Sequence, residues 1–224
     1  MSSDAARTAA AAAAVELVEP GMTLGLGSGR AVWRVVELLA SSGDPVRAVV
    51  ASSRTDELAR SAGFTVLTLD GTVSPELAID GADEVDPSLG LIKGGGGALL
   101  REKILISAAQ RFVVVAEASK KVARLGEGFK LPVEVVRFGW KDTARRLGAL
   151  LPDWTQRLRE DGEAYITDEG HFILDCTLPA VPAIGELGRS IKQVPGVVEH
   201  GLFIGMASQA LLGHPDGSVE ALQP

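Results

Sequence analysis

Short apolar runs alternate with amphipathic stretches along the first half of the chain. The apolar runs predict strands at Met22–Leu26, Val46–Val50, Phe64–Leu69, Leu77–Ile79, Leu89–Ile92 and Phe112–Ala116. The stretches with helical spacing predict helices at Ala5–Val18, Ala31–Ala40, Thr55–Ala62 and Ala98–Gln110. Strands that are apolar on both faces and separated by helices are typical of a parallel sheet covered on both sides.

The pattern changes near Leu131. From there we expect strands at Val133–Phe138, Thr155–Leu158, Ala164–Thr167, Phe172–Cys176 and Val197–Phe203, and helices at Asp142–Leu151 and Glu186–Gln193. A hairpin is expected around Asp168-Glu169-Gly170. The order, roughly β-α-β-β-α-β, resembles a split βαβ, ferredoxin-like unit.

The predicted fold class is therefore α/β with two domains. Residues 1–129 and 203–224 are expected to form a main domain around a parallel, Rossmann-like sheet. Residues 130–202 are expected to form a small α+β domain.

Five polar or glycine-rich segments each follow a predicted strand. They are GLGSGRA, ASSRT, DGADE, KGGGG and EASKK. In an open parallel sheet such loops share one edge, where ligands bind. Any one of them alone is weak evidence, because Gly and Asp are ordinary turn residues.

Composition narrows the class of ligand. The formal net charge of −7 argues against general binding of nucleic acid or of an anionic membrane. An anionic ligand must then be held by local Lys, Arg and backbone N–H groups. Cys176 is the single cysteine, which excludes an internal disulfide and a cysteine-based zinc cluster and fits a reducing cytoplasm. Neither a signal peptide nor a transmembrane helix is expected.

The first loop, GLGSGRA, is similar to a dinucleotide-binding motif, GxGxxG, but it does not match that motif fully. The third glycine of GxGxxG falls on Arg30, and the second strand ends in Ala51-Ser52-Ser53 instead of an acid. The remaining functional interpretation is a phosphate cradle of Ser28, the amides of Gly29 to Ala31 and the Arg30 guanidinium. The alternative is a tight strand-to-helix turn.

The acidic cluster and the glycine run suggest a second half of the site. Asp80, Asp83, Glu84 and Asp86 allow a Mg²⁺ or Ca²⁺ site, a set of acceptors for a polyol, or a solvated loop. Lys93 argues against the metal, and for Asp86, which is followed by Pro87, the solvated loop is the preferred interpretation. Lys93 with the following glycines predicts an oxyanion or phosphate pocket. Lys120 is a candidate phosphate ligand, whereas Lys121 is expected at the surface.

Glu102 is the sharpest single candidate. At helical spacing it shares a face with Leu99 and Ile106, where a carboxylate is unfavourable unless it is paired or functional. Desolvation raises the pKa of such a group and suits it to act as a general base. The alternative is a buried ion pair with Lys93 or Arg101. Arg101 and Lys103 are expected to face solvent or a partner subunit, and the three histidines receive no catalytic role.

Taken together, these segments are recognisable. The chain resembles ribose-5-phosphate isomerase, type A, through GLGSG, Ser52–Thr55, LAIDGADEVD, LIKGGGGALLREKI, ASKKVARLG, ITDEGHFILDC and VPGVVEHGLFIGMA. These pieces cover most of the chain in the expected order. KGGGGALLREKI after DGADE is highly specific, whereas GLGSG alone is not.

The resemblance implies isomerisation of ribose 5-phosphate to ribulose 5-phosphate through an enediol(ate), with no metal and no cofactor, by a homodimer or homotetramer. It implies that Glu102 moves a proton between C1 and C2, and that Asp80 takes part in ring opening and hydroxyl binding. Lys93 with the amides of Gly94, Gly95 and Gly96 would stabilise the oxyanion. The sugar would lie along Asp80, Gly81, Ala82 and Asp83, and the phosphate along Ser28, Gly29, Arg30, Ala31 and Lys120.

One loop departs from the family pattern. Ser28-Gly29-Arg30-Ala31 stands where the family usually has Thr-Gly-Ser-Thr, so two hydroxyls are lost and a guanidinium appears. Either Arg30 takes over phosphate binding, or it faces outward, or the chain prefers another phosphosugar. Two other functions are considered: a non-catalytic phosphosugar sensor, and a related enzyme such as an amino-sugar phosphate deaminase or a CoA transferase. The set Asp80, Lys93 and Glu102 favours the isomerase.

Overall fold

The computed structural model describes residues 3–181 and 183–224. Its largest element is a seven-stranded sheet in the order β14-β13-β7-β4-β1-β2-β3. The strands are β1 (Thr23–Leu26), β2 (Arg47–Val50), β3 (Thr65–Val66), β4 (Leu77–Asp80), β7 (Phe112–Glu117), β13 (Gln209–Gly213) and β14 (Val219–Leu222). All neighbours pair in parallel except β13 and β14, which are antiparallel. The predicted parallel sheet is therefore confirmed, and the chain end adds two strands to it.

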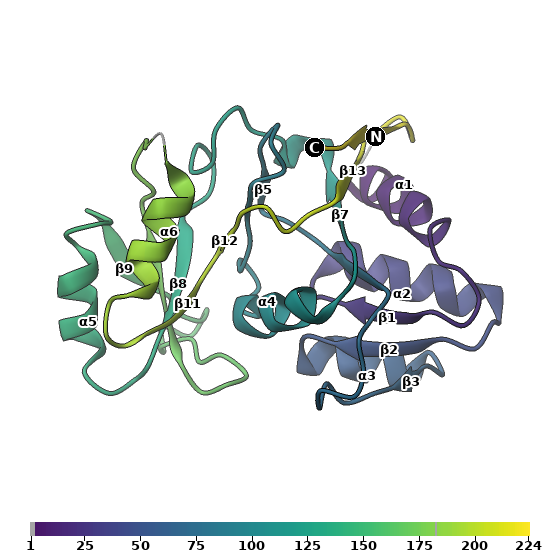
Figure 1. Cartoon of the computed structure of the whole chain (residues 1–224), viewed down its shortest axis with the longest axis horizontal. Coiled ribbons are helices and arrows are strands. Elements are labelled where there is room, and N and C mark those ends of the chain that lie inside the picture. The colour runs from purple at the N-terminus through teal and green to yellow at the C-terminus, as the bar shows by residue number, and fades with distance from the viewer. Residues whose placement is uncertain (1–2, 182) are drawn as a thin grey trace.

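Both faces of this sheet are buried, as the doubly apolar strands predict. Alternate residues of β4 and β7 enter two different cores: Leu77, Ile79 and Val113 pack with the helices α1 and α2, and Ala78 and Val114 pack on the opposite side. The helices are α1 (Ser3–Val15), α2 (Arg30–Ser42), α3 (Ser53–Ser61) and α4 (Leu99–Ala108). Figure 1 shows α1 and α2 beside the large sheet and α4 between it and the second half of the molecule.

A second, four-stranded sheet has the order β11-β8-β10-β9, with every neighbouring pair antiparallel. Its elements are β8 (Leu131–Val135), α5 (Trp140–Leu147), β9 (Trp154–Gln156), β10 (Phe172–Cys176), α6 (Ile184–Lys192) and β11 (Val197–His200). This is the predicted β-α-β-β-α-β order, and it has its own apolar core. The domain boundaries at 129/130 and 202/203 stay a prediction, and residues 1, 2 and 182 in those ranges lie outside the described part.

Three of the expected strands are wrong in detail. Val197–Phe203 is expected as one strand, but it divides at Gly201 into β11 (Val197–His200) of the four-stranded sheet and β12 (Leu202–Phe203) of a three-stranded sheet. Leu89–Ile92 was assigned to the parallel sheet, but β6 (Leu91–Ile92) lies in a separate antiparallel sheet with β5 (Glu84–Val85) and β12 (Leu202–Phe203). A short apolar run carries no information about its partner. Ala164–Thr167 forms one isolated bridge, Leu158 to Ala164, and β10 pairs with β9 instead. The expected turn is present, since the Gly170 N–H donates to Thr167 O over 2.9 Å.

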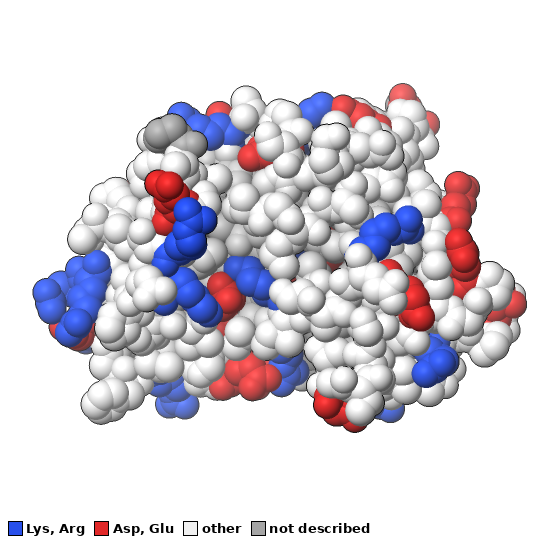
Figure 2. Space-filling view, in the orientation of Figure 1, with Lys and Arg blue, Asp and Glu red and all other residues white. Residues whose placement is uncertain are grey.

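Charged side chains are mixed in sign over the face seen in Figure 2, where blue and red groups alternate around a broad uncharged area. Within the described residues, no helix is long and apolar enough to cross a membrane. Cys176 is buried and unbridged.

Candidate active site

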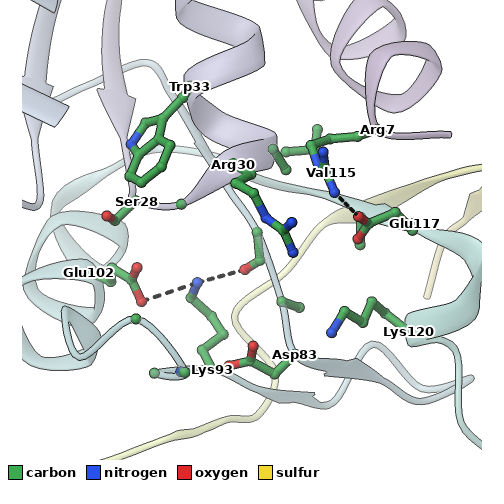
Figure 3. A pocket seen from close by; sticks show the side chains of 18 residues that line it. Arg7, Ser28, Arg30, Trp33, Asp83, Lys93, Glu102, Val115, Glu117 and Lys120 are labelled. Carbon is green, nitrogen blue, oxygen red and sulfur yellow. Dashed lines mark hydrogen bonds and ion pairs between the residues drawn. The ribbon is translucent and has the colours of Figure 1, made fainter. Parts of the chain in front are cut away.

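The carboxyl ends of β1, β4 and β7 meet at one edge of the large sheet, where strand order changes direction along the chain. A cavity of about 270 Å³ opens there. Its walls come from the loops after these strands, from the glycine segment after β6, and from α1, α2 and α4 (Figure 3). Thus one of the segments expected at the edge of the parallel sheet, KGGGG, reaches the cavity from the smaller antiparallel sheet instead.

The cavity gathers almost every residue predicted from the sequence. It is lined by Ser28, Gly29, Arg30, Ala31, Gly81, Ala82, Asp83, Lys93, Gly94, Gly95, Gly96, Glu102 and Lys120. Asp80 is the exception: it is 1% exposed and lies behind Lys93.

A buried lysine between two carboxylates forms the base of the cavity. The Lys93 Nζ lies 3.2 Å from Glu102 Oε2 (Figure 3). It also lies 2.8 Å from Asp80 Oδ2 and donates to Gly81 O over 2.6 Å. Lys93 is 3% exposed and Glu102 5%. The alternative pairing of Glu102 with Arg101 is wrong, since the ion pair of Glu102 is with Lys93. Apart from Lys93, no described residue bonds Asp80 Oδ2 or Glu102 Oε2.

Backbone amides hold the other oxygen of Asp80. Its Oδ1 accepts the N–H of Gly81 over 2.7 Å and the N–H of Ser28 over 3.2 Å. The first loop can approach so closely because Gly27 has no side chain: a Cβ there would lie 1.9 Å from the Asp80 carboxyl carbon. The glycine-rich first loop and the acidic loop are therefore packed against each other.

Burial and shared charge set the protonation of this group. Burial, and after it the charge of Asp80, raises the pKa of Glu102 to about 8, although Lys93 opposes the change. Burial also raises the pKa of Asp80, against Lys93 and the two amides. Burial alone would lower the pKa of Lys93, but the two carboxylates outweigh it and raise that pKa. One cation serves two acids, and burial raises the pKa of both carboxyl groups.

The glycine segment forms the adjoining wall. Lys93 extends the antiparallel ladder by donating its N–H to Gly201 O over 2.9 Å, and the chain then turns at Gly94, whose φ is 106°. The Gly95 N–H is already donated to Asp83 Oδ2 over 2.8 Å. No acceptor for the Gly96 N–H is found within the described residues.

The opposite wall is the start of α2. Gly29, with φ 94°, caps the helix without a side-chain bond, so the first amides of α2 have no acceptor in the helix. The Ser28 hydroxyl shares a 2.9 Å hydrogen bond with Ser52, the N-cap of α3. Arg30, the first residue of α2, is exposed at the mouth and points into the cavity in Figure 3, as Lys120 does from the far side.

Five lining residues were not predicted: Arg7, Trp33, Val115, Ala116 and Glu117. Arg7 is the most informative, because it is 7% exposed and its Nη2 lies 2.6 Å from Glu117 Oε1. A signal for it existed in the sequence. Arg7 falls on the stripe of α1 that buries Ala10, Ala11 and Ala14, where a guanidinium requires a partner.

The acidic cluster is dispersed by the fold. Asp83 faces the cavity and the glycine segment, whereas Glu84 accepts three backbone N–H groups from residues 126–129. Asp86, expected in a solvated loop, is half-buried and accepts the N–H groups of Ser88 and Gly90, each over 2.8 Å, so it holds a turn. In residues 3–181 and 183–224, no group of three or more His, Cys, Asp or Glu is arranged to hold a metal ion.

Two basic residues of α4 were expected to face solvent or a partner. Arg101 is partly exposed, as expected, and pairs with Asp168 over 3.0 Å and with Glu169 over 2.6 Å. Lys103 differs from the expectation: its side chain is 15% exposed and donates to Glu199, His200 O and Leu202 O. The error arises because the 130–202 segment covers this side of α4. Lys121 is partly exposed and pairs with Glu220, as a surface position allows.

Comparison with known proteins identifies relatives over the whole chain. The family model of ribose 5-phosphate isomerase A (phosphoriboisomerase A) matches residues 47–217. The ribose-5-phosphate isomerase A of Synechococcus sp. (strain JA-3-3Ab) is 46% identical over 99% of this chain and 98% of its own length. That of Roseiflexus castenholzii is 48% identical over 96% of this chain and 94% of its own.

Solved structures of similar fold lead to the same family as the sequence relatives. The ribose 5-phosphate isomerase A from Methanocaldococcus jannaschii matches with a TM-score of 0.92 and 34% identity, over 100% of both chains. A D-ribose-5-phosphate isomerase in complex with phospho-erythronic acid matches with a TM-score of 0.95 and 30% identity, again over 100% of both. With the sequence motifs, the fold and the cavity all in agreement, the chain belongs to the ribose 5-phosphate isomerase A family.

Proposed function

We propose that this chain interconverts ribose 5-phosphate and ribulose 5-phosphate by proton transfer through an enediolate. The single observation that carries the proposal is the buried Asp80–Lys93–Glu102 group at the base of the cavity. Membership of the isomerase family supports it. So does the relative solved with phospho-erythronic acid, a phosphorylated four-carbon acid whose planar, anionic carboxylate has the shape of an enediolate.

The phosphate is bound at the start of α2. The free amides of Arg30 and Ala31, the Gly29 backbone and the Ser28 hydroxyl form the cradle, and Lys120 supplies charge from the opposite side. Arg30 replaces the hydroxyls that the family usually has in this loop, and a guanidinium matches phosphate in a bidentate way.

The sugar lies between this cradle and Lys93, along Gly81, Ala82 and Asp83. Ring opening takes the proton of the anomeric hydroxyl and adds one to the ring oxygen. The Lys93 ammonium at the cavity surface gives its proton to the ring oxygen, and the resulting amine takes the proton of the anomeric hydroxyl, so the ammonium is restored before isomerisation. Asp80 acts on this step through Lys93, because the aspartate itself is buried 2.8 Å away from the Nζ.

Isomerisation then needs one base. Glu102 takes the proton from C2 of the open aldose, and the electrons move to O1. The proton of the C2 hydroxyl passes to O1, the C2 carbonyl forms, and Glu102 returns its proton to C1. Lys93 and the free amides of the glycine segment stabilise the negative oxygen while it exists. A carboxylate with a pKa of about 8 is well matched to this task near neutral pH.

A direct assay tests the proposal. Purified chain is mixed with ribose 5-phosphate in EDTA, formation of ribulose 5-phosphate is followed, and arabinose 5-phosphate is added as a competing ligand. We expect turnover that EDTA does not change and that arabinose 5-phosphate inhibits. Saturable binding of ribose 5-phosphate without turnover would instead favour the sensor, and the proposed function would be wrong.

We also propose that the chain works in the cytoplasm as a homodimer or homotetramer, as the family resemblance implies. Sedimentation velocity at micromolar concentration distinguishes these assemblies from a monomer.

A further inference from the structure

An arginine of the small sheet holds the glycine segment from behind. The Arg157 Nη1 donates to Gly94 O over 2.7 Å and to Gly95 O over 3.1 Å. The Tyr165 hydroxyl donates to the next carbonyl, Gly96 O, over 3.1 Å. Three successive carbonyls of the cavity wall are therefore bonded to side chains that lie more than sixty residues away in the sequence.

Hydrogen bonds of both its backbone and its side chain hold Arg157 in place. Its N–H donates to Ile173 O over 2.9 Å, which continues the ladder between β9 and β10. The Nε donates to Asp175 Oδ2 over 2.9 Å, and Nη2 bonds the other oxygen of the same carboxylate. The side chains of Arg157 and Asp175 are only 13% and 21% exposed. A guanidinium fixed on both edges in this way has little freedom to follow a moving loop.

Peptide planarity carries this restraint to the cavity. In a trans peptide the N–H points away from the C=O, so fixing Gly95 O also fixes the direction of the Gly96 N–H. No described residue accepts that N–H, and nothing lies within 4 Å of a Cβ built on Gly96. By the same geometry, the bond to Gly94 O directs the Gly95 N–H at Asp83.

Glycine makes such a restraint necessary. Four glycines in a row have more backbone freedom than any other sequence, and their peptides can flip at little steric cost. An amide contributes to transition-state stabilisation only if it already points at the place where charge develops. The loop therefore needs an external clamp on its carbonyl side.

We propose that Arg157 is a positioning residue for the isomerisation: it holds the Gly95–Gly96 peptide so that the Gly96 N–H faces the negative oxygen of the enediolate. Asp175 orients Arg157, and Tyr165 supports the next peptide. This inference rests on the proposed function. It assigns to the small sheet an indirect effect on the chemical step, exerted through the Gly95–Gly96 peptide, although none of the described residues of that sheet lines the cavity.

The test measures kcat, KM and two inhibition constants in Arg157→Ala, Arg157→Lys and Asp175→Asn. One inhibitor is phospho-erythronic acid, which carries a charged oxygen like the enediolate, and the other is ribitol 5-phosphate, which does not. The matched control is Arg159→Ala, because Arg159 lies on the same segment but is more than half exposed and pairs only with Asp161. Thermal unfolding is recorded for every variant.

We expect Arg157→Ala to lower kcat by about tenfold to a hundredfold and to change KM by less than about threefold, since one oxyanion donor is worth that much or more. Its inhibition constant for phospho-erythronic acid should rise about tenfold, with that for ribitol 5-phosphate unchanged. Arg157→Lys and Asp175→Asn should show smaller losses of the same kind, and Arg159→Ala none.

Wild-type kcat in folded Arg157→Ala, or an equal rise of both inhibition constants, would overturn the proposal. If Arg157→Ala does not fold, the same criteria apply to Arg157→Lys and Asp175→Asn. Absence of turnover in the wild type would overturn the proposed function instead, so the two failures are distinguishable.

Discussion

Glu84 and Glu102 are two glutamates of almost equal burial, 2% and 5% exposed, in very different surroundings. Glu84, on β5, accepts the N–H groups of Gly126, Gly128 and Phe129. Glu102, on α4, has the Lys93 ammonium at 3.2 Å, and that ammonium lies closer still to Asp80. One carboxylate is fully bonded by backbone, and the other shares a cation.

These two glutamates show that burial alone does not identify a catalytic acid or base. Three amide donors satisfy the Glu84 carboxylate, which fixes the 126–129 loop in place. Glu102 lines a cavity with too few donors, so burial raises its pKa to about 8. A group in this state exchanges its proton near neutral pH.

The largest effect is expected from Glu102→Gln. The amide keeps the shape but accepts no proton, so kcat should fall by about a thousandfold or more while substrate still binds. Stability should not fall with it. The raised pKa means that wild-type stability decreases as pH rises from the ordinary glutamate range through about 8, and the glutamine lacks this loss. Kinetics and thermal melts at pH 9 check both statements, and wild-type turnover would refute the mechanism.

The pH profile should show the second largest effect. Because Glu102 must be deprotonated to act as base, kcat/KM should rise by about tenfold per pH unit below about pH 8 and level off above it. The measurement is kcat/KM across this range with wild type and with Glu84→Gln as the control. A flat profile between about pH 6 and 8 would contradict a base with this raised pKa.

Arg30→Ala extends the comparison to the phosphate end, where the charge is exposed and not buried. We expect KM for ribose 5-phosphate to rise by about threefold to tenfold with kcat little changed, because an exposed cation contributes modestly and acts equally on ground and transition states. An unchanged KM would mean that Arg30 takes no part in binding. Arg54→Ala, an exposed arginine that stacks 4.6 Å from the Trp33 ring centroid, is a charge-matched control.

Glu84→Gln should have the smallest effect on chemistry. One carboxylate oxygen becomes an NH₂ that cannot accept the backbone N–H it faces, so the free energy of unfolding should fall by about 1–3 kcal/mol. The kcat of the folded enzyme should stay within about twofold of wild type. Urea unfolding and steady-state kinetics together test this. A loss of kcat as large as that of Glu102→Gln would erase the distinction between the two glutamates.

Much of the fold was accessible from pattern alone. Runs apolar on both faces, separated by helical spacing, predicted the large parallel sheet because only burial on both sides accounts for them. The β-α-β-β-α-β order of the second half was predicted as well. Short elements were the weak point: β6 and β12 have two residues each, and nothing in Leu91–Ile92 says that its partners are Glu84–Val85 and Leu202–Phe203.

The site, like the fold, was partly predictable from the sequence and partly not. The residue types of the site, an acidic loop, a lysine before four glycines and a glutamate on an apolar helix face, were legible because each is unfavourable unless a partner exists. The sequence by itself therefore indicated that Glu102 needs a partner or a function, and it left Lys93 and Arg101 open as that partner. It singled out Glu102 on its apolar helix face and placed Glu84 only in the acidic cluster, but it did not show which donors each acid meets.

Tertiary structure alone decided which donors reach which acid. Arg7 enters the cavity from α1 and Arg157 reaches the glycine carbonyls from the small sheet, and each bond joins positions far apart in the chain. Local propensity contains no information about such contacts, since they depend on how two sheets pack around α4. The residue types indicated which chemistry the site can perform, whereas long-range packing decided how its side chains and amides are arranged.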